Sequence, residues 1–454
     1  MKKDVNMLSG SIIKGLLTIA IPIMVMNVVQ SLFNIIDMTI LKMYDTDGGY
    51  TVGAVGAGGT LISLITGLLI GSASGANVII ARAIGSGDDK KTSRAVGTSL
   101  FIAIVGGLIL LVVGVSFAEV FLSLVNCPLE LMSQASLYFR LYFVGVPILM
   151  VYNFCAAILR STGDTKRPMV YLTIGGVFKV LLTFLFVAVF NMKVEGVAFA
   201  TIISWLISAI LGFLALYKNE GKVKLRLSNI KLFKTECKQI LKIGIPAGLQ
   251  QALYSIANVI IAATVNSFGK DATTGISIAN QFDGILYQIV TAPALAVMPY
   301  VSQNVGNGNI KRASQSIVRG MMITVCLGAT FGALSAIFSR ELSSIMSSNP
   351  EVIAYSQQKM IIISSTYFIC GINEILGASL RGMNRPLVAT IATLLFMCAI
   401  RFVWVYFVFP LMPNLTFLYL IWPIGWVLSI SMLLIFLLPT IKKLKRESKT
   451  VLDV

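Results

Sequence analysis

The chain contains no histidine and only 19 acidic residues. The lack of histidine excludes or disfavours several classes of function. Without histidine, zinc centres of the common kind, serine–histidine catalysis and histidine proton relays are excluded or disfavoured. Any proton that the protein transports must therefore bind to carboxylates. The cysteines show no paired or metal-ligand spacing, so we expect them to pack as small apolar residues: Cys127, Cys155, Cys237, Cys326, Cys370 and Cys398.

Charge is also scarce. Of 454 residues, 56% are hydrophobic and 12% are charged, and the mean hydropathy is +0.86. This composition is typical of an all-α polytopic membrane protein. We expect no cleavable signal peptide, because the first apolar stretch is long and lacks a small-residue cleavage site. The length criterion predicts about twelve spans, at residues 12–41, 51–81, 96–125, 134–160, 168–190, 195–217, 239–266, 272–304, 316–338, 355–381, 386–410 and 416–441.

The net charge is +17, and the basic residues responsible for it lie between the apolar spans. They therefore indicate membrane topology rather than nucleic-acid binding. Basic residues precede the first span, follow every second span and end the chain. The alternate loops contain Asp45, Asp47, Glu119, Glu130 and Glu351. The positive-inside rule then places both termini in the cytoplasm.

An even number of spans in each half returns the chain to its starting side. We therefore expect two six-helix lobes, related by a pseudo-two-fold axis along the membrane normal. The lobes would comprise residues 1–217 and 239–454, joined by a cytoplasmic basic linker at 218–238. Substrate would bind near the membrane midplane between the lobes.

A polar face runs along the first span. Asn27, Gln30, Asn34 and Asp37 recur at steps of three, four and three, which places them on one side of a helix. A carboxylate in hydrocarbon is costly unless it meets water, a cation or a partner, so Asp37 is a candidate functional residue. The alternative is a polar seam that joins two helices.

The pattern returns at the start of the second half, where Pro22 falls on Pro246 at a constant offset. The second polar face consists of Gln251, Tyr254 and Asn258. Ile261, however, stands at the position equivalent to Asp37. The chain is therefore a duplication with one charged difference between its halves.

Other segments also recur in both halves. The turns IGSGD (84–88) and VGNGN (305–309) lie in the long segments 52–96 and 276–317, and ILRSTGDTKRP (158–168) pairs with SLRGMNRP (379–386). These segments resemble the second and eighth spans, and the loops after the fourth and tenth, of the multidrug and toxic compound extrusion (MATE) family of secondary transporters. The resemblance covers nearly the whole chain.

The resemblance implies a plasma-membrane antiporter that exports organic cations or other amphipathic molecules, driven by a proton or sodium gradient. In the family, an aspartate of the first span forms part of a cation site in the N-terminal lobe, and Asp37 occupies that position. Thr201 matches a family threonine of the sixth span. Lys179 and Thr183 stand where the family has an asparagine and an aspartate. An ammonium thus takes part of the sodium site, so we favour proton coupling.

A lysine inside a lobe needs a counter-charge, and Asp37 is the only acidic residue deep in the N-terminal spans. We therefore hypothesise an ion pair between Lys179 and Asp37, near Asn34, in which the ammonium replaces a bound cation. Protonation of Asp37 would release Lys179 and change helix packing. A permanent structural pair is the alternative.

The C-terminal half carries further charges within its spans. Glu374 lies where the family often has an acidic residue, and Arg401 is the repeat mate of Lys179, so we expect these two to pair. Asp283 and Glu374 are the carboxylates that we expect to meet a cationic substrate. The candidate cavity residues are Asn27, Gln30, Gln251, Tyr254, Asn258, Gln281, Asp283, Glu374 and Arg401.

Three other functions remain open. A flippase for lipid-linked saccharides, in the same superfamily, would use arginines against a diphosphate, whereas here acidic and basic candidates oppose one another. A membrane enzyme has no metal cluster, nucleophile–base pair or cofactor motif to support it, and we expect no cofactor. A channel differs from a carrier in turnover rate and gradient-driven accumulation. We expect a monomer whose partners are a small-molecule substrate, a proton or sodium ion, and the bilayer.

Overall fold

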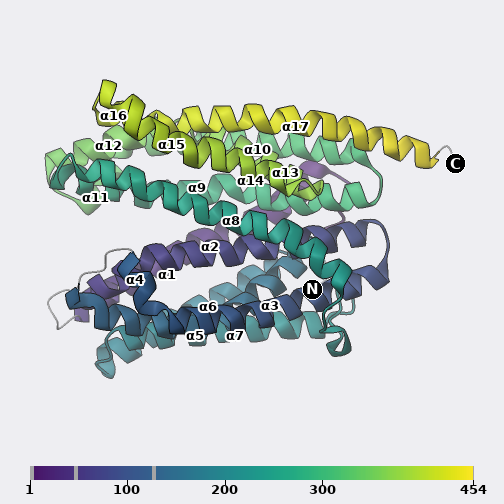
Figure 1. The fold of residues 1–454 in the computed structure, drawn as a ribbon, viewed down its shortest axis with the longest axis horizontal. Helices are drawn as coiled ribbons and strands as arrows, with labels where there is room; N and C mark the ends of the chain where they lie inside the picture. The colour runs from purple at the N-terminus through teal and green to yellow at the C-terminus, as the bar shows by residue number, and fades with distance from the viewer. Residues whose placement is uncertain (1–4, 45–49, 125–128, 453–454) are drawn as a thin grey trace. The chain divides into compact units, whose positions relative to one another are not determined.

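The structure is a computed structural model that describes residues 5–44, 50–124 and 129–452. Within these ranges every regular element is helical (Figure 1). The α-helices of the first half are α1 Ile12–Tyr44, α2 Tyr50–Gly85, α3 Asp89–Ser116, α4 Ala118–Leu124, α5 Leu129–Ser161, α6 Lys166–Phe184 and α7 Val194–Tyr217. Those of the second half are α8 Lys234–Asn266, α9 Lys270–Gly306, α10 Ile310–Ile337, α11 Ser339–Met346, α12 Pro350–Ser364, α13 Tyr367–Gly382, α14 Pro386–Thr393, α15 Ile400–Val403, α16 Leu415–Tyr419 and α17 Ile421–Leu452.

Five shorter segments have other helical geometries. The π-helical ones are η1 Leu185–Val189, η3 Leu394–Ala399 and η4 Trp404–Val408, and the 3₁₀ ones are η2 Leu227–Asn229 and η5 Phe409–Leu411. Single π-helical turns inside α-helices occur frequently at functional sites. Two of the three flank α15, and the third follows α6.

The expected number of spans is confirmed. In the described part of the chain, eleven helices are long and apolar enough to cross a membrane, and α12 with α13 makes a twelfth span bent by 47°. The bend falls at Thr366, whose hydroxyl donates to the carbonyl oxygens of Ile362 and Ile363, at 3.1 and 3.0 Å. A side-chain hydroxyl that competes for these carbonyls accounts for a break without proline.

The chain divides into two compact units. The first contains Val25–Ile84 and Asp88–Gly248, and the second contains Val5–Met24, Gly85–Gly87 and Leu249–Val454. Helices α1 and α8 therefore contribute to both units. In each helix the change falls two residues after a proline, Pro22 or Pro246. The lobe boundary expected at residues 218–238 stays a prediction.

Glycines allow close helix packing in the first unit. A Cβ atom on Gly71 of α2 would lie 2.4 Å from the Cα of Gly248, and one on Gly75 would lie 2.2 Å from the carbonyl oxygen of Ile240. Small residues that let backbones approach one another are the usual helix contact in membranes. Around them, α5 packs along both α3 and α7, as Figure 1 shows.

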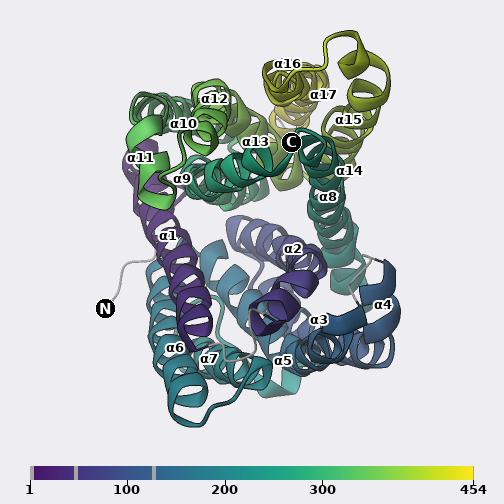
Figure 2. The ribbon, with the colours of Figure 1, turned by 90° about the vertical axis from the view of Figure 1, so that its left-hand side faces the viewer.

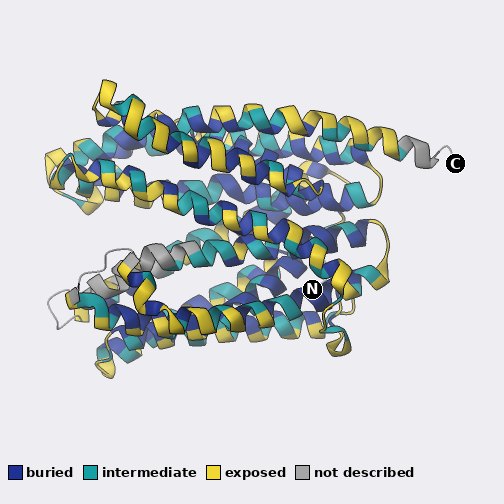
Figure 3. Ribbon diagram, in the orientation of Figure 1, coloured by how far each residue is buried: buried dark blue, intermediate teal, exposed yellow. Residues whose placement is uncertain are grey.

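In the second unit, α9 packs against α10, α12 and α13, and α13 also packs along α17. Figure 2, which views the helices nearly end-on, shows α9, α10, α12 and α13 grouped together. The buried apolar core includes Ile261, Tyr419 and Trp426. Figure 3 shows exposed residues along the length of α17, and apolar ones such as Ile435 suit contact with lipid.

The repeated turns have equivalent geometry. Gly87 and Gly308 adopt positive φ angles of 73° and 75°, which confirms the tight reversals expected of IGSGD and VGNGN. The next residue caps the following helix in both turns: Asp88 accepts from the backbone of α3 and Asn309 from that of α10.

Candidate functional site

Lys179 of α6 and Asp37 of α1 form a buried ion pair in the first unit. The Lys179 Nζ lies 2.5 Å from the Asp37 Oδ2, and the two side chains are 17% and 5% exposed. The contact is the one that the sequence predicts, and its role stays a prediction. The second carboxylate oxygen of Asp37 has no hydrogen-bond partner in the described part of the chain.

The two candidate threonines of the first unit lie on α6 and α7. Thr183, one turn after Lys179 on α6, is fully buried, and its hydroxyl has no partner among the residues described. Two residues later the α-helix gives way to the π-helical η1. Thr201 of α7 is also buried, but its hydroxyl donates to the carbonyl of Val197 at 2.8 Å. The carboxylate and Thr183 hydroxyl therefore keep free acceptor capacity.

Two other candidate residues of the first span are more exposed than Asp37. Asn27 is half-buried and Gln30 is exposed, and both lie on α1 before Asp37. The side chain of Asn34 lies outside the described residues. Across the described ranges no three acidic, cysteine or histidine side chains gather as a metal site.

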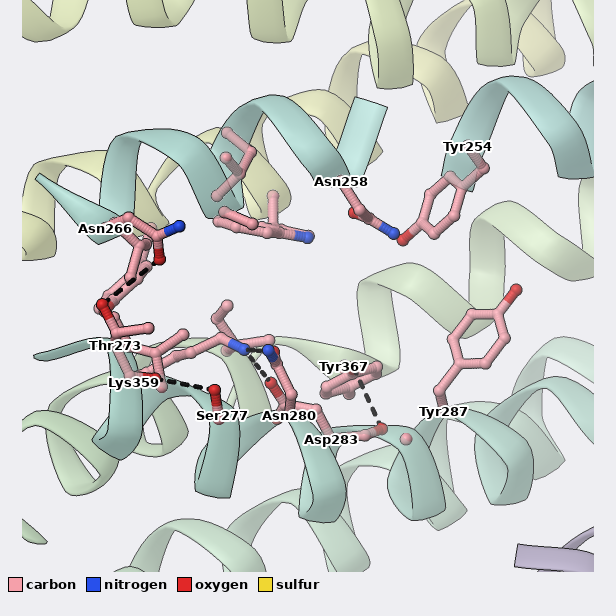
Figure 4. Close-up of a pocket in the computed structure, with 18 residues that line it drawn as sticks. Tyr254, Asn258, Asn266, Thr273, Ser277, Asn280, Asp283, Tyr287, Lys359 and Tyr367 are labelled. Atoms are coloured by element: carbon pink, nitrogen blue, oxygen red, sulfur yellow. Dashed lines mark hydrogen bonds and ion pairs between the residues drawn. The ribbon is translucent and has the colours of Figure 1, made fainter. Parts of the chain in front are cut away.

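The second unit contains a cavity of about 320 Å³, which Figure 4 shows in close-up. Tyr254 and Asn258 of α8 line it on one side, and Asn280 and Asp283 of α9 line it on the other. Lys359 of α12 also lines it. Its aromatic walls are Tyr254, Tyr287, Tyr367, Tyr419 and Trp422.

A second buried ion pair lines this cavity. The Lys359 Nζ lies 2.8 Å from the Asp283 Oδ2, with side-chain exposures of 5% and 10%. The ammonium also donates to the amide oxygen of Asn280, and Figure 4 shows it reaching both partners. The hydroxyl of Tyr367 donates to the Asp283 carbonyl at 3.3 Å, whereas the carboxylate Oδ1 has no partner among the described residues.

Lys359 is not among the candidate residues predicted from the sequence. A signal was available, because the residue lies inside the predicted span 355–381 and needs a counter-charge as Lys179 does. Asp283, already a candidate, supplies it.

Arg401 has partners other than the one expected. Its side chain is 1% exposed and donates from Nη1 to the Asn258 Oδ1 at 2.6 Å. The guanidinium also lies 5.0 Å from the ring centre of Tyr254 and 5.2 Å from that of Trp422. Aromatic faces attract a cation at such distances. Nη2 has no partner among the residues that the structure describes.

The expected pair between Arg401 and Glu374 is therefore wrong, since no ion pair joins them in the described chain. Glu374 instead lines a small second cavity with Gln251 and Tyr254. Gln281, exposed on α9, lines neither cavity. Two aromatic rings and one amide contact the guanidinium in place of a carboxylate, and they leave Nη2 without a hydrogen-bond partner among the described residues.

The charges around the larger cavity are unequal. Asp283 is the only carboxylate among its lining residues, whereas Lys359 lines it and Arg401 is bonded to its wall at Asn258. The cavity can therefore offer a substrate aromatic faces, amide groups and either sign of charge, provided that the Lys359–Asp283 pair separates.

Comparisons with known proteins agree with this architecture. The MatE family model matches residues 22–185 and 246–407. Probable multidrug resistance protein YpnP of Bacillus subtilis (strain 168) is 26% identical over 402 residues, which are 88% of this chain and 89% of that protein. The FAD transporter of Shewanella oneidensis is 23% identical over 399 residues, 87% of each protein. The crystal structure of MATE in complex with MaL6 has a TM-score of 0.91 at 20% identity, covering 98% of this chain and 100% of that one, and so shows the same fold.

Proposed function

The chain belongs to the MatE family of membrane transporters, and from this membership we propose that it is a proton-coupled antiporter that exports organic cations or amphipathic drugs by alternating access. It is a multi-pass membrane protein. The observation that carries the proton-coupling proposal is the ion pair between Lys179 and Asp37. It supports protons over sodium because the tethered ammonium already supplies the positive charge that a bound sodium ion would bring.

The pair can act as a switch between two packings of the first unit. While Asp37 is ionised, Lys179 holds α6 to α1. A proton on Asp37 removes the attraction, and the ammonium, already 17% exposed, can turn toward water. The π-helical η1 directly after α6 gives this part of the chain a place to change its helical register.

The cavity of the second unit is our proposed substrate site. Its volume of about 320 Å³ lies at the small end of the range of ligand pockets, roughly 300–1,000 Å³. A planar cation would stack on the tyrosine rings and pair with Asp283 in place of Lys359. The free Oδ1 of Asp283 gives such a cation a first contact before the ion pair separates.

A second possible substrate class is an aromatic anion, and a separate observation supports it. Lys359 pairs with the lining carboxylate Asp283, the buried Arg401 is bonded to the cavity wall at Asn258, and the Nη2 of Arg401 is unpartnered in the described structure. An aromatic anion would pair with these groups. One relative is named FAD transporter, and FAD is an aromatic anion; the lipid-linked saccharide of a flippase would use the same two cations.

Transport by purified protein in proteoliposomes tests the proposal. With a pH gradient imposed and sodium absent, we expect substrate to move against its concentration gradient. With a sodium gradient alone, at equal pH on both sides, we expect no such movement. Accumulation driven by sodium but not by pH would overturn proton coupling, and flux that only dissipates gradients would indicate a channel.

We further propose that the protein is a monomer in the plasma membrane with both termini cytoplasmic. The basic loops after every second span support this orientation. Protease added to sealed right-side-out vesicles should leave tags at both ends intact, and should cleave both once the vesicles are opened.

A further inference from the structure

A basic cavity lies outside the proposed transport machinery, in the first unit. It has a volume of about 810 Å³ and lies between the start of α3 and the segment that leads into α8. We call it the linker cavity. Two acidic residues, Asp89 and Glu220, line it together with six basic ones, Lys90, Arg94, Lys222, Lys224, Arg226 and Lys231.

The segment of residues 220–233, which carries four of the six basic residues, packs against the rest of the first unit rather than extending into solvent. Val223 and Leu225 are each 1% exposed, and the Leu225 amide donates to the carbonyl of Leu216 at the end of α7, at 3.0 Å. Farther along, the Asn229 side chain donates to the Ser93 hydroxyl of α3 at 2.8 Å. The basic side chains alternate with these anchors, so they project from a held backbone.

Close approach to α3 fixes the same segment from the other side. A Cβ on Gly97 would lie 1.8 Å from the carbonyl oxygen of Asn229, so only glycine allows this contact. Arg94 and Lys231 both lie over the ring of Phe233, at 5.4 and 5.3 Å from its centre. The aromatic ring thereby holds two cations from different elements at one wall of the cavity.

This arrangement has an electrostatic cost that topology does not explain. The six cations and two carboxylates leave an excess of positive charge in one place, and like charges repel. Membrane orientation requires basic residues in this loop but does not require an ordered backbone that gathers them around a cavity. An anion in the cavity would remove the repulsion.

We propose that the linker cavity binds a phosphate group, carried by an anionic phospholipid or by a soluble phosphate compound. Several charge-assisted hydrogen bonds from arginine and lysine are the usual means of holding phosphate. The cavity lies next to the end of α7 and the start of α3, two helices that are long and apolar enough to cross a membrane. A phospholipid could therefore reach it from the bilayer and a soluble phosphate from water.

Binding to purified full-length protein in detergent tests this site. The probes are short-chain phosphatidylglycerol, short-chain phosphatidylcholine and inorganic pyrophosphate, each followed by calorimetric titration at low salt. We expect phosphatidylglycerol to bind more tightly than phosphatidylcholine. Competition by pyrophosphate would assign the site to phosphate in general, and a lack of competition would assign it to the lipid.

Two triple variants separate the linker cavity from general surface charge. In Lys222→Gln/Lys224→Gln/Arg226→Gln, we expect anion affinity to fall by about tenfold or more, since each cation near a headgroup contributes on the order of a few-fold. The control, Lys442→Gln/Lys443→Gln/Lys445→Gln, removes the same charge from the exposed end of α17. Equal losses in both variants, or no binding of any anionic probe to the unaltered protein, would overturn the proposal. Melting temperatures should be close in all three proteins, which shows that each is folded.

Discussion

The Lys179 ammonium lies 2.5 Å from the Asp37 carboxylate, and the second unit has its own such pair between Lys359 and Asp283, at 2.8 Å. The two pairs are not images of one another. The first joins α6 to α1, whereas the second joins α12 to α9, and Ile261 stands where a repeat of Asp37 would be. Each unit therefore neutralises a buried ammonium with a carboxylate of its own, recruited from different helices.

Removing one partner of the first pair should abolish gradient-driven transport. In Asp37→Asn or Lys179→Met a buried charge remains without its counter-charge, which costs about 3–5 kcal/mol of stability in comparable pairs. We expect both single variants to melt at lower temperature and to lose proton-driven accumulation in proteoliposomes.

The double variant Asp37→Asn/Lys179→Met distinguishes a switch from a static contact. It leaves no unpaired charge, so its melting temperature should recover toward that of the unaltered protein. If the pair carries the coupling proton, transport should remain lost despite this recovery. Restored transport in the double variant would show that the pair is structural.

Substitution within the second pair should change which substrates bind. Lys359→Met leaves Asp283 as an unpaired carboxylate in the cavity, so we expect the affinity for a planar cation such as ethidium to rise and that for an aromatic anion to fall. Asp283→Asn should do the opposite. Hydrogen bonds to charged groups are worth about 1.5–3 kcal/mol, which sets the scale at tenfold or more.

Fluorescence titration with both probes measures these affinities, and Ser277→Ala, a lining residue without charge, is the matched control. If each charge variant weakened both probes to the same extent, the cavity would not discriminate by charge. In that case the proposal that substrate binds there would fail.

The sequence predicted those features that follow from the cost of burying charge. Lys179 needed a carboxylate, and Asp37 was the one available in its spans, so the contact followed. The turns around Gly87 and Gly308 also followed, because a tight reversal needs a residue that tolerates positive φ. Both arguments use local chemistry and do not require the three-dimensional packing.

Arg401 shows where such reasoning fails. A charged neighbour, Glu374, lay in the adjacent span, but the structure buries the guanidinium against an amide and two rings. Aromatic side chains abound in any membrane protein, so sequence alone does not mark which of them will meet a cation. The bend between α12 and α13 was missed for a related reason, since it depends on the hydroxyl of Thr366 rather than on a proline.

Two glycine substitutions of the same kind should have different effects on stability. In Gly75→Ala the new methyl group would lie 2.2 Å from a backbone oxygen of α8, which cannot move without shifting the helix. We expect a loss of about 1–3 kcal/mol, typical of overpacking. Gly106→Ala on α3 meets nothing closer than 3.5 Å and should be neutral or stabilising by up to about 1 kcal/mol. Thermal unfolding in detergent measures both, and equal effects would show that α2 and α8 are not in tight contact.

The hydrogen-exchange protection of residues 5–11, which precede α1, should depend on Arg312. The Arg312 guanidinium donates to three backbone carbonyls, from Nε to Met7 at 2.9 Å, from Nη1 to Gly10 at 3.0 Å and from Nη2 to Ser9 at 2.6 Å. Because the carbonyls of residues before a helix have no intrahelical partners, this contact fixes where α1 starts within the second unit. In Arg312→Gln we expect the amides of residues 5–11 to exchange hydrogen at least tenfold faster, while the rest of α10 stays protected.

The exchange rate of these amides in Arg312→Lys should fall between those of the unaltered protein and Arg312→Gln. An ammonium is a single point of charge and does not reproduce the planar fork of the guanidinium. Lys311→Gln, an exposed neighbour, is the control and should leave exchange unchanged. Hydrogen–deuterium exchange with mass spectrometry resolves the segment directly. Unchanged protection of residues 5–11 in Arg312→Gln would mean that buried Met7 and the Asn304 side chain, which donates to the Met7 carbonyl at 3.1 Å, suffice to hold the start of α1.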